Sequence, residues 1–262
     1  MKKFQIKDKI ILITGVEGQL GNAFTNFLLS CGAKVIGIDI KKTSSIVDEN
    51  YYYIKADITK VDELKNSLIE LQKNFYLPNV LINNAAIDTP PGSQKLDTGY
   101  FEDFSEDIMK KVIDVNIFGL LNCCKIFGAS IKKNYSNGSI INISSIYGIV
   151  SPDQSIYDYK REKGEIFFKP ISYSATKGSL FNITRYLSTY WAKDNIRVNT
   201  LSFAGVFNNQ DENFLKNYCS RIPLGRMANP EDYFGPLYFL CSEMSSYVTG
   251  ANIVADGGWT AI

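Results

Sequence analysis

Short runs of Ile, Val and Leu alternate with longer segments of helical spacing, and this alternation constrains the fold more than any other feature of the sequence. The short runs barely alternate between polar and apolar residues, which is typical of strands covered on both faces by helices. Strands linked in this way form right-handed crossovers and a parallel sheet. The expected strands are Ile10–Thr14, Lys34–Asp39, Tyr51–Lys55, Val80–Asn83, Ser139–Ser144, Arg197–Ser202 and Asn252–Ala255.

The segments between these strands carry helical patterns. Helices are expected over Val61–Phe75, within Phe104–Lys133 and over Ser172–Ala192. Thr59 and Asp62 resemble a capping pair in front of the first of these helices, and Pro170 introduces the last. No shift in composition marks a second domain. The sequence therefore predicts a single doubly wound α/β (Rossmann) domain over residues 1–262, with a parallel sheet of about seven strands and helices on both faces.

Charge and composition exclude several classes of function. The 28 basic and 27 acidic residues give a net charge of +1, which points neither to nucleic acid nor to an anionic membrane surface. The first apolar run, Ile10–Ile13, is too short for a membrane span or a signal peptide. Five cysteines without a C-x-x-C motif predict reduced thiols and a cytoplasmic location. Because histidine is absent, we expect no His-dependent triad and no metal site.

A glycine-rich loop follows the first expected strand and precedes a helix. Gly15, Gly18 and Gly21 allow a tight turn and a close approach of the backbone to a pyrophosphate. The positive end of the helix dipole stabilises the phosphates, and Gln19 and Leu20 lie in the same segment. The order of strand, loop and helix predicts a dinucleotide-binding site.

Asp39 ends the second expected strand, 18 residues after Gly21. A carboxylate there accepts hydrogen bonds from the ribose hydroxyls of adenosine and repels the additional phosphate of NADP. Lys41 and Lys42 follow it and soften that repulsion. The sequence therefore favours NAD, with NADP as the less favoured cofactor, and a solvated turn residue is the alternative interpretation of Asp39.

Several short motifs follow the glycine loop in order along the chain. They are Asn83-Asn84-Ala85-Ala86, Asn116, Ile143-Ser144-Ser145-Ile146-Tyr147-Gly148, Tyr173-Ser174-Ala175-Thr176-Lys177, Ile196-Arg197-Val198-Asn199 and Asp256-Gly257-Gly258. Together they resemble the short-chain dehydrogenase/reductase family, and the likeness extends from Lys9 to the end of the chain. The resemblance implies a nicotinamide-dependent oxidoreductase acting on a hydroxyl or carbonyl group.

Tyr173 and Lys177 are four residues apart and share one face of a helix. A free phenol has a pKa of about 10, and a neighbouring ammonium lowers that pKa toward the range useful for acid/base catalysis. The resemblance implies that Tyr173 exchanges a proton with the substrate oxygen, while Lys177 also holds the nicotinamide ribose. It further implies that Ser145 hydrogen-bonds the reacting oxygen and that Asn116 supports a water linking Lys177 to solvent.

The resemblance also assigns further contacts to the cofactor. The expected residues are Asp57 and Ile58 beside the adenine, Asn84, Ala85 and Ala86 along the cofactor path, and Val206 at the nicotinamide carboxamide.

Two spacings depart from the family pattern. The glycine spacing resembles that of the larger sugar-nucleotide epimerases and dehydratases, whose longer C-terminal region a chain of 262 residues hardly accommodates. Ser145 and Tyr173 are 28 residues apart, more than the family usually has. Tyr159 and Lys163 also fit Y-x-x-x-K, but their charged surroundings offer little apolar face. Tyr173 is therefore preferred, and residues 149–171 are predicted to form an insertion beside the active site.

The insertion and a predicted substrate loop around 206–225 are rich in polar residues, which suit a hydroxyl-rich ligand. Solvated loops have the same composition. The polar residues are Asp153, Tyr157, Asp158, Lys160, Arg161, Asn208, Asn209, Gln210 and Asp211. Of these, Lys160 and Arg161 are candidates for binding a phosphate of the substrate.

A narrower resemblance concerns Ser145–Gly148, Pro170–Tyr173 and Gly205–Phe207. These segments resemble bacterial dehydrogenases of sugar-acid metabolism and of surface-sugar synthesis, such as that of legionaminic acid on flagellin. The expected substrate is a small polar molecule, namely a sugar, a sugar phosphate or a sugar acid.

Two other functions remain open. One is a sugar-nucleotide epimerase or dehydratase with tightly bound NAD, which the glycine spacing favours. The other is a non-catalytic nucleotide-binding member of the same fold, which the presence of Asn116, Ser145, Tyr173 and Lys177 argues against. The family resemblance also implies a homodimer or homotetramer that assembles through the two long helices.

Overall fold

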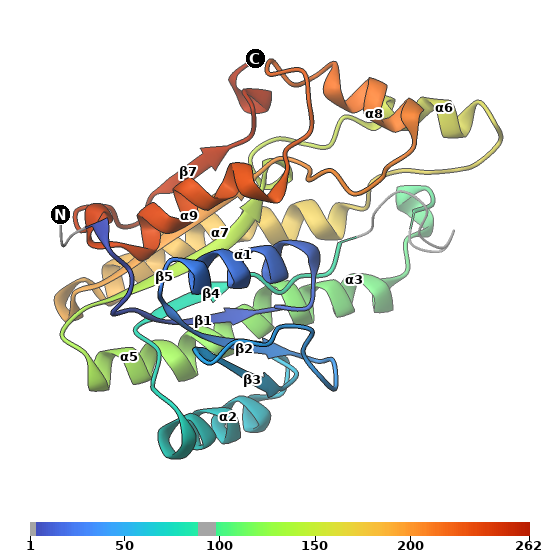
Figure 1. Cartoon of the computed structure of the whole chain (residues 1–262). Coiled ribbons are helices and arrows are strands. Elements are labelled where there is room, and N and C mark those ends of the chain that lie inside the picture. Colours follow the sequence, from blue (N-terminus) through green and yellow to red (C-terminus); the bar gives the residue numbers. More distant parts are fainter. Residues whose placement is uncertain (1–3, 89–97) are drawn as a thin grey trace.

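The computed structural model describes residues 4–88 and 98–262, and these residues form one parallel sheet with helices on both faces (Figure 1). Its strand order is β3-β2-β1-β4-β5-β6-β7. The strands are β1 (Ile10–Thr14), β2 (Lys34–Asp39), β3 (Tyr51–Lys55), β4 (Val80–Asn83), β5 (Gly138–Ser145), β6 (Ile196–Phe203) and β7 (Asn252–Ala255). The doubly wound sheet predicted from the sequence is therefore confirmed.

The sheet differs from the sequence prediction only at the ends of two strands. β5 and β6 each extend one residue further at both ends than expected. The two strands pair in register from Gly138 with Ile196 to Ser145 with Phe203. This long ladder carries Ser145 beyond the buried middle of the sheet to its carboxyl edge.

Two hydrophobic cores fill the space between the sheet and its helices. On one face, α1 (Gln19–Ser30) and α9 (Phe234–Cys241) contribute residues such as Phe24 and Leu237. On the other, α2 (Val61–Asn74), α5 (Ala129–Asn134) and α7 (Ile171–Tyr190) contribute residues such as Leu64 and Leu180. Burial on both faces explains why the strands are so uniformly apolar.

The long helical segment expected within Phe104–Lys133 is present but not regular. It runs through α3 (Glu106–Ile113), α4 (Leu120–Cys123) and α5, and the residues between them, Asp114–Gly119 and Cys124–Gly128, are π-helical. Within the described residues this helix, Glu106–Asn134, is the one long and apolar enough to cross a membrane. Half of its most apolar part is buried in the protein, so packing against the sheet accounts for that character.

The expected capping pair at the start of α2 is wrong. The helix begins after Lys60 and no side chain caps it. Thr59 instead donates to Asp57, both from its backbone N–H at 2.9 Å and from its hydroxyl at 2.8 Å. Asp57 therefore stabilises the turn between β3 and α2.

The insertion packs against the loop after β6 rather than standing free. Its short helix α6 (Asp158–Arg161) lies beside α8 (Glu212–Cys219) above the carboxyl edge of the sheet (Figure 1). Tyr157 and Phe167 of the insertion share a third hydrophobic cluster with Phe214 of α8. The two segments form one layer over the edge of the sheet.

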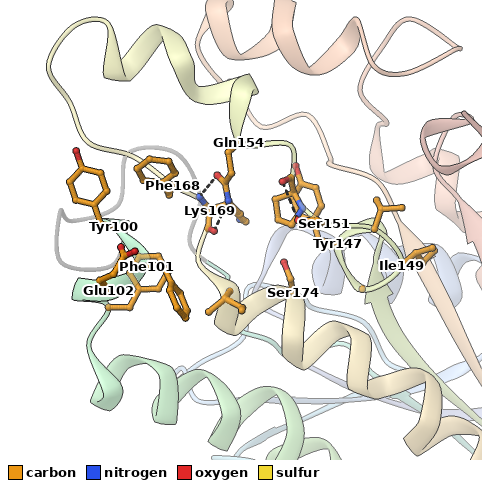
Figure 2. A pocket seen from close by; sticks show the side chains of 15 residues that line it. Tyr100, Phe101, Glu102, Tyr147, Ile149, Ser151, Gln154, Phe168, Lys169 and Ser174 are labelled. Atoms are coloured by element: carbon orange, nitrogen blue, oxygen red, sulfur yellow. Dashed lines mark hydrogen bonds between the residues drawn. The ribbon is translucent and has the colours of Figure 1, made fainter.

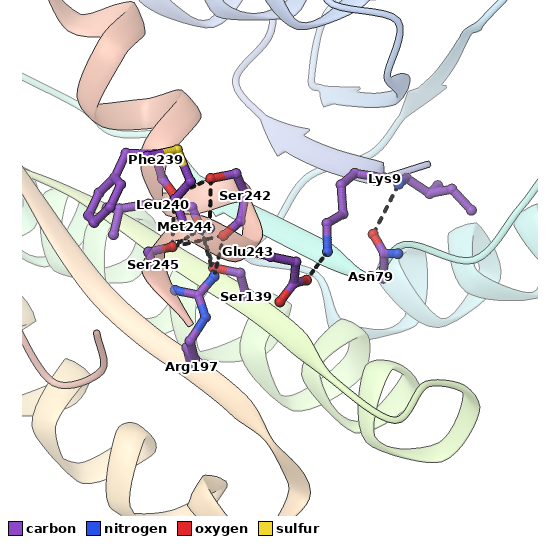
Figure 3. Close-up of polar contacts among 11 residues, drawn as sticks. Lys9, Asn79, Ser139, Arg197, Phe239, Leu240, Ser242, Glu243, Met244 and Ser245 are labelled. Carbon is purple, nitrogen blue, oxygen red and sulfur yellow. Dashed lines mark hydrogen bonds and ion pairs between the residues drawn. The ribbon is translucent and has the colours of Figure 1, made fainter. Parts of the chain in front are cut away.

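At the amino-terminal edge of the sheet, Arg197 of β6 hydrogen-bonds the C-terminal end of α9 (Figure 3). Its guanidinium donates to the carbonyls of Leu240 at 2.9 Å, Ser242 at 3.3 Å and Val248 at 3.4 Å. Ser139 of β5 donates to the same Leu240 carbonyl at 2.8 Å. These donors satisfy carbonyls that the end of a helix leaves unpaired.

We expect Arg197→Met to lower the free energy of unfolding by about 2 to 4 kcal/mol, because buried carbonyls lose a charged donor. Denaturant unfolding monitored by circular dichroism measures this change. The control is Arg185→Met on the exposed face of α7, for which we expect a change within about 0.5 kcal/mol. Equal losses in the two variants would contradict a capping role for Arg197.

Candidate active site

The strand order reverses between β1 and β4, and ligands of such sheets bind outside the carboxyl ends at this point. Gly15 follows β1 with a φ of +71°, and a Cβ there would lie 2.9 Å from the Cα of Ala85. A Cβ on Gly21 would lie 2.1 Å from the carbonyl oxygen of Gly15. Only glycines fit these positions, and the cradle they leave suits a pyrophosphate at the N-terminus of α1.

Hydrogen bonds join the glycine loop to the segment after β4. The hydroxyl of Thr14 accepts the backbone N–H groups of Asn84 at 3.1 Å and Ala85 at 3.0 Å. The Asn84 side chain donates to the Thr14 carbonyl at 3.0 Å. The structure thus brings together the glycine loop and the Asn84–Ala86 segment, as the sequence predicts.

Asp39 lies at the carboxyl end of β2, against the glycine loop. Its carboxylate accepts the backbone N–H of Glu17 at 3.0 Å and that of Lys41 at 3.1 Å. The Lys41 ammonium donates to the Glu17 carbonyl at 3.2 Å. These contacts hold the Asp39 carboxylate where an adenosine ribose bound along the loop would meet it.

The remaining cofactor candidates lie along the same edge. Ile58 is buried against Gly119 of the long helix, and Asp57 precedes it in the turn after β3. Val206 pairs with Ala228 in the loop after β6. The side chain of Gln19 donates to the carbonyl of Phe207 at 2.7 Å, so this loop reaches the start of α1.

Tyr173 and Lys177 lie on the first turns of α7, facing β5. The Lys177 ammonium is 5.7 Å from the centre of the Tyr173 ring and donates to the carbonyl of Ile143 at 2.8 Å. Ser144 donates to the Lys177 carbonyl at 2.9 Å, which holds the helix close to the strand. Ser145 hydrogen-bonds the Tyr173 phenol. The three residues predicted to act together are therefore assembled at one point.

Burial dominates the electrostatics of this group. It raises the pKa of Tyr173 well above its usual range, the carboxylate of Asp88 raises it further, and the hydrogen bond from Ser145 opposes both. Burial also lowers the pKa of Lys177 from 10.5 to about 8, against the opposing effect of Asp88. A phenolate at Tyr173 therefore requires positive charge close to the ring.

Asn116 lies in the first π-helical segment, and its side chain is 3% exposed. It accepts the N–H of Ile87 at 2.8 Å and donates to the Ile87 carbonyl at 3.0 Å and to Thr176 at 3.1 Å. The π-turn thus directs Asn116 toward both β4 and α7. Asn116 therefore connects the segment after β4 to α7. Its support of a water that links Lys177 to solvent stays a prediction.

The alternative pair Tyr159 and Lys163 lies apart from this group. The Tyr159 hydroxyl donates to Asp211 at 2.6 Å, and Lys163 is exposed. The expectation that Lys160 and Arg161 meet a phosphate stays a prediction, and both residues are paired within the insertion. Lys160 pairs with Glu165 at 2.7 Å.

Arg161 is likewise committed within the insertion. Its guanidinium donates to the carbonyls of Phe167 and Gln154 at 2.7 Å each, and it pairs with Asp158. Most of the polar residues predicted to line a hydroxyl-rich site stabilise the two loops in this way instead. Asp153, for example, pairs with Arg221 at 2.5 Å.

A cavity of about 580 Å³ opens beside the start of α7 (Figure 2). One wall is aromatic and includes Tyr100, Phe101 and Phe168. Lys169 and Tyr147 line it as well. Both also lie close to Tyr173, with the Lys169 ammonium 5.0 Å from the ring centre of Tyr173.

Sequence reasoning missed Lys169 and Asp88, which form an ion pair beside Tyr173. Neither residue belongs to a family motif, and the two lie far apart in the sequence. The one available signal was the position of Lys169 directly before Pro170, which places it at the N-terminus of the catalytic helix.

The low pKa of Lys177 predicts a pH-dependent effect on stability. The charge on Lys177 destabilises the folded state fully below about pH 8, and this penalty disappears as the pH rises to 10.5. We therefore expect the Lys177→Met variant to be inactive. In the absence of cofactor, its free energy of unfolding at pH 7 should exceed that of the wild type by about 1 to 3 kcal/mol. Chemical denaturation at several pH values measures the difference.

The difference should narrow as the pH approaches about 10. Lys193→Met, at an exposed position, is the control and should change stability little at any pH. A stability difference that does not vary with pH would show that the charge of Lys177 is not its cause.

The chain resembles known proteins over nearly its whole length. A family model described as enoyl-(acyl carrier protein) reductase matches residues 15–260. The 2-dehydro-3-deoxy-D-gluconate 5-dehydrogenase of Escherichia coli strain K12 is 27% identical over 273 residues, an alignment that covers 100% of this chain and 99% of that protein.

Two solved structures extend this result. A short-chain dehydrogenase from Leptospira borgpetersenii with bound NAD⁺ has a TM-score of 0.87 and 35% identity, and the match covers 98% of this chain and 95% of that one. A putative NAD(P)-dependent gluconate 5-dehydrogenase from Beutenbergia cavernae with bound NADP has a TM-score of 0.83 and 25% identity, covering 99% and 100%. The chain belongs to the short-chain dehydrogenase/reductase family of pyridine-nucleotide oxidoreductases.

Proposed function

We propose that the protein is an NAD-dependent dehydrogenase that interconverts a secondary hydroxyl and a carbonyl of a sugar acid. The observation that carries the proposal is the buried Tyr173 phenol, hydrogen-bonded by Ser145 and flanked by the ammonium groups of Lys177 and Lys169. This group lies at the carboxyl edge of the sheet, beside the glycine cradle.

The residues of the chain divide the work on the substrate oxygen. Tyr173 takes the hydroxyl proton during oxidation and returns it during reduction, and Ser145 holds the oxygen in place by a hydrogen bond. Burial raises the pKa of Tyr173, and the Lys177 ammonium, 5.7 Å from the ring centre, would favour the phenolate during catalysis. Bound NAD supplies a hydride acceptor at the nicotinamide and a positive ring that acts in the same direction as Lys177.

The residues along the carboxyl edge fit such a cofactor. The glycine loop and the start of α1 would hold the pyrophosphate, and Asp39 would accept the adenosine ribose hydroxyls. Val206 and the Asn84–Ala86 segment would line the rest of the path. The Leptospira relative has bound NAD⁺, which supports this choice, whereas the Beutenbergia relative has bound NADP.

The proposed substrate class rests on the relatives and on the cavity. The curated relative from Escherichia coli bears the name of a sugar-acid dehydrogenase, and so does the solved structure from Beutenbergia. The cavity beside α7 has room for a six-carbon ligand, with polar groups of Gln154 and Lys169 on one side and aromatic rings on another. Aromatic faces pack well against the apolar faces of sugar rings and chains.

Assembly and location complete the proposal. The aromatic side chains of Phe118, Tyr186 and Tyr190 are exposed on the long helix and on α7, where a partner subunit would cover them. This supports a homodimer or homotetramer through these helices. The five cysteines are all unpaired, which agrees with a reducing cytoplasm.

We expect Tyr173→Phe to lower kcat by about 10² to 10⁴-fold, because the proton transfer loses its acid/base. The assay follows the absorbance of NADH with D-gluconate, 2-dehydro-3-deoxy-D-gluconate and related sugars as substrates. Tyr159→Phe is the matched control and should retain the wild-type kcat, since its hydroxyl is held by Asp211.

The same assay separates the alternatives. An epimerase or dehydratase would convert sugar nucleotides without net change in free NADH, and a non-catalytic member would bind NADH tightly without turnover. Coverage of 99% of the Escherichia coli relative by this chain supports the one-domain dehydrogenase over the larger epimerases.

A second prediction concerns the choice of cofactor. We expect Asp39→Ser to lower kcat/KM with NAD by about 10- to 100-fold, because the ribose hydroxyls lose a charged acceptor. The loss with NADP should be smaller, since the variant no longer repels the 2′-phosphate. Kinetics with both cofactors measure the ratio. Glu49→Ser, an exposed carboxylate in the following loop, is the control. An unchanged ratio would exclude Asp39 as the determinant.

A further inference from the structure

Lys169 is a charged side chain that is 5% exposed, and its burial requires an explanation. A buried ammonium destabilises a protein unless it is paired. Its partner is the carboxylate of Asp88, which is 43% exposed and follows the segment after β4. The pair lies directly beside the phenol of Tyr173, since the Lys169 ammonium is 5.0 Å from the ring centre.

The insertion fixes the backbone that carries Lys169 (Figure 2). The side-chain amide of Gln154 accepts the Lys169 N–H at 2.9 Å and donates to the Lys169 carbonyl at 3.1 Å. The neighbouring Phe168 donates its N–H to the carbonyl of Thr98 at 2.8 Å, and Pro170 then begins α7. Hydrogen bonds to the backbone of Lys169 and of the neighbouring Phe168 therefore hold this segment in place.

The two lysines near Tyr173 point to different partners. Lys177 donates to the carbonyl of Ile143 in β5, on the side of the sheet. Lys169 lines the cavity of about 580 Å³, and its ammonium is 5.0 Å from the ring centre of Tyr173, which is not itself a lining residue. Among the described residues that line this cavity, Lys169 is the basic side chain and Glu102 an acidic one. Lys160 and Arg161 are paired inside the insertion.

The ion pair of Lys169 and Asp88 allows an anion to bind at Lys169 without leaving a buried charge unpaired. Asp88 already places one negative charge near Tyr173 and raises its pKa. A substrate carboxylate that takes the place of Asp88 on Lys169 leaves the local charge unchanged, while a neutral sugar leaves the ion pair intact. Exchange of one carboxylate for another thus avoids burying an unpaired charge.

We propose that Lys169 is the specificity-determining residue for the substrate carboxylate, and that Asp88 is the counter-ion it exchanges for that group. This inference rests on the proposed dehydrogenase function and narrows its substrate to anionic sugars. The Gln154 clamp holds Lys169 in position for the exchange. The insertion therefore contributes the side chain of Lys169 to recognition, whereas Lys160 and Arg161 stabilise the loop.

The test compares D-gluconate with D-glucitol, which differ in a carboxylate against a hydroxymethyl group. We expect Lys169→Met to raise the ratio of KM for D-gluconate to KM for D-glucitol by about 10- to 100-fold, and to leave the Kd for NADH unchanged. Lys169→Arg should restore most of the preference for D-gluconate. Lys163→Met, an exposed lysine of the insertion, is the control and should retain wild-type constants.

A second variant guards against misfolding, since Lys169→Met leaves Asp88 without its cation. The double variant Asp88→Asn, Lys169→Met removes both charges and should fold with its discrimination for D-gluconate lost. Asp88→Asn alone should lower KM for D-gluconate several-fold, because the substrate no longer competes with a resident carboxylate.

A thermal-shift measurement with NADH present gives a readout that does not need turnover. D-gluconate should stabilise the wild type and Asp88→Asn, but not the double variant. An equal stabilisation of wild type and double variant, or none of the wild type, would overturn the carboxylate site. Turnover of D-gluconate with an unchanged preference in the double variant would overturn it while leaving the dehydrogenase function in place. Failure of every sugar acid to react would instead defeat the proposed function.

Discussion

The seven strands run in the same direction, and the rest of the site depends on this constraint. Parallel strands deliver their carboxyl ends to one edge, so residues far apart in the sequence meet there. The shared direction of the strands alone places four site residues at this edge, since each of them follows or ends a strand: Gly15, Asp39, Asn84 and Ser145. At the opposite edge, the contacts of Arg197 hold the end of α9.

A chain of buried hydrogen bonds then fixes α7 on the sheet. Asn83 of β4 donates to Asn142 of β5 at 2.8 Å, and Asn142 donates to Thr184 of α7 at 2.9 Å. Thr184 in turn lies 2.7 Å from the hydroxyl of Thr200 in β6. Because buried polar groups must be paired, this chain allows one register of the helix against three strands. This chain of hydrogen bonds therefore also fixes the positions of Tyr173 and Lys177 on α7.

The sequence predicts most of this arrangement, because its signals are local or periodic. Uniformly apolar strands follow from burial on both faces, and the four-residue spacing of Tyr173 and Lys177 follows from the helix. The π-turn that orients Asn116 has no such signal. The contacts of the charged residues in the insertion have no such signal either, since composition does not tell whether Arg161 faces a ligand or the carbonyl of Phe167. Lys169 and Asp88 are 81 residues apart and only tertiary structure joins them.

The two buried lysines beside the Tyr173 phenol, Lys177 and Lys169, have different roles. Lys177 supplies the positive charge that a buried phenolate requires, and burial brings its own pKa down to about 8. Lys169 is balanced by Asp88, whose carboxylate opposes ionisation of Tyr173. A substrate carboxylate that displaces Asp88 from Lys169 restores the same balance at the same place. In the proposed exchange, one ion pair therefore faces both the charge of the substrate and Tyr173, and a neutral substrate would leave that pair intact.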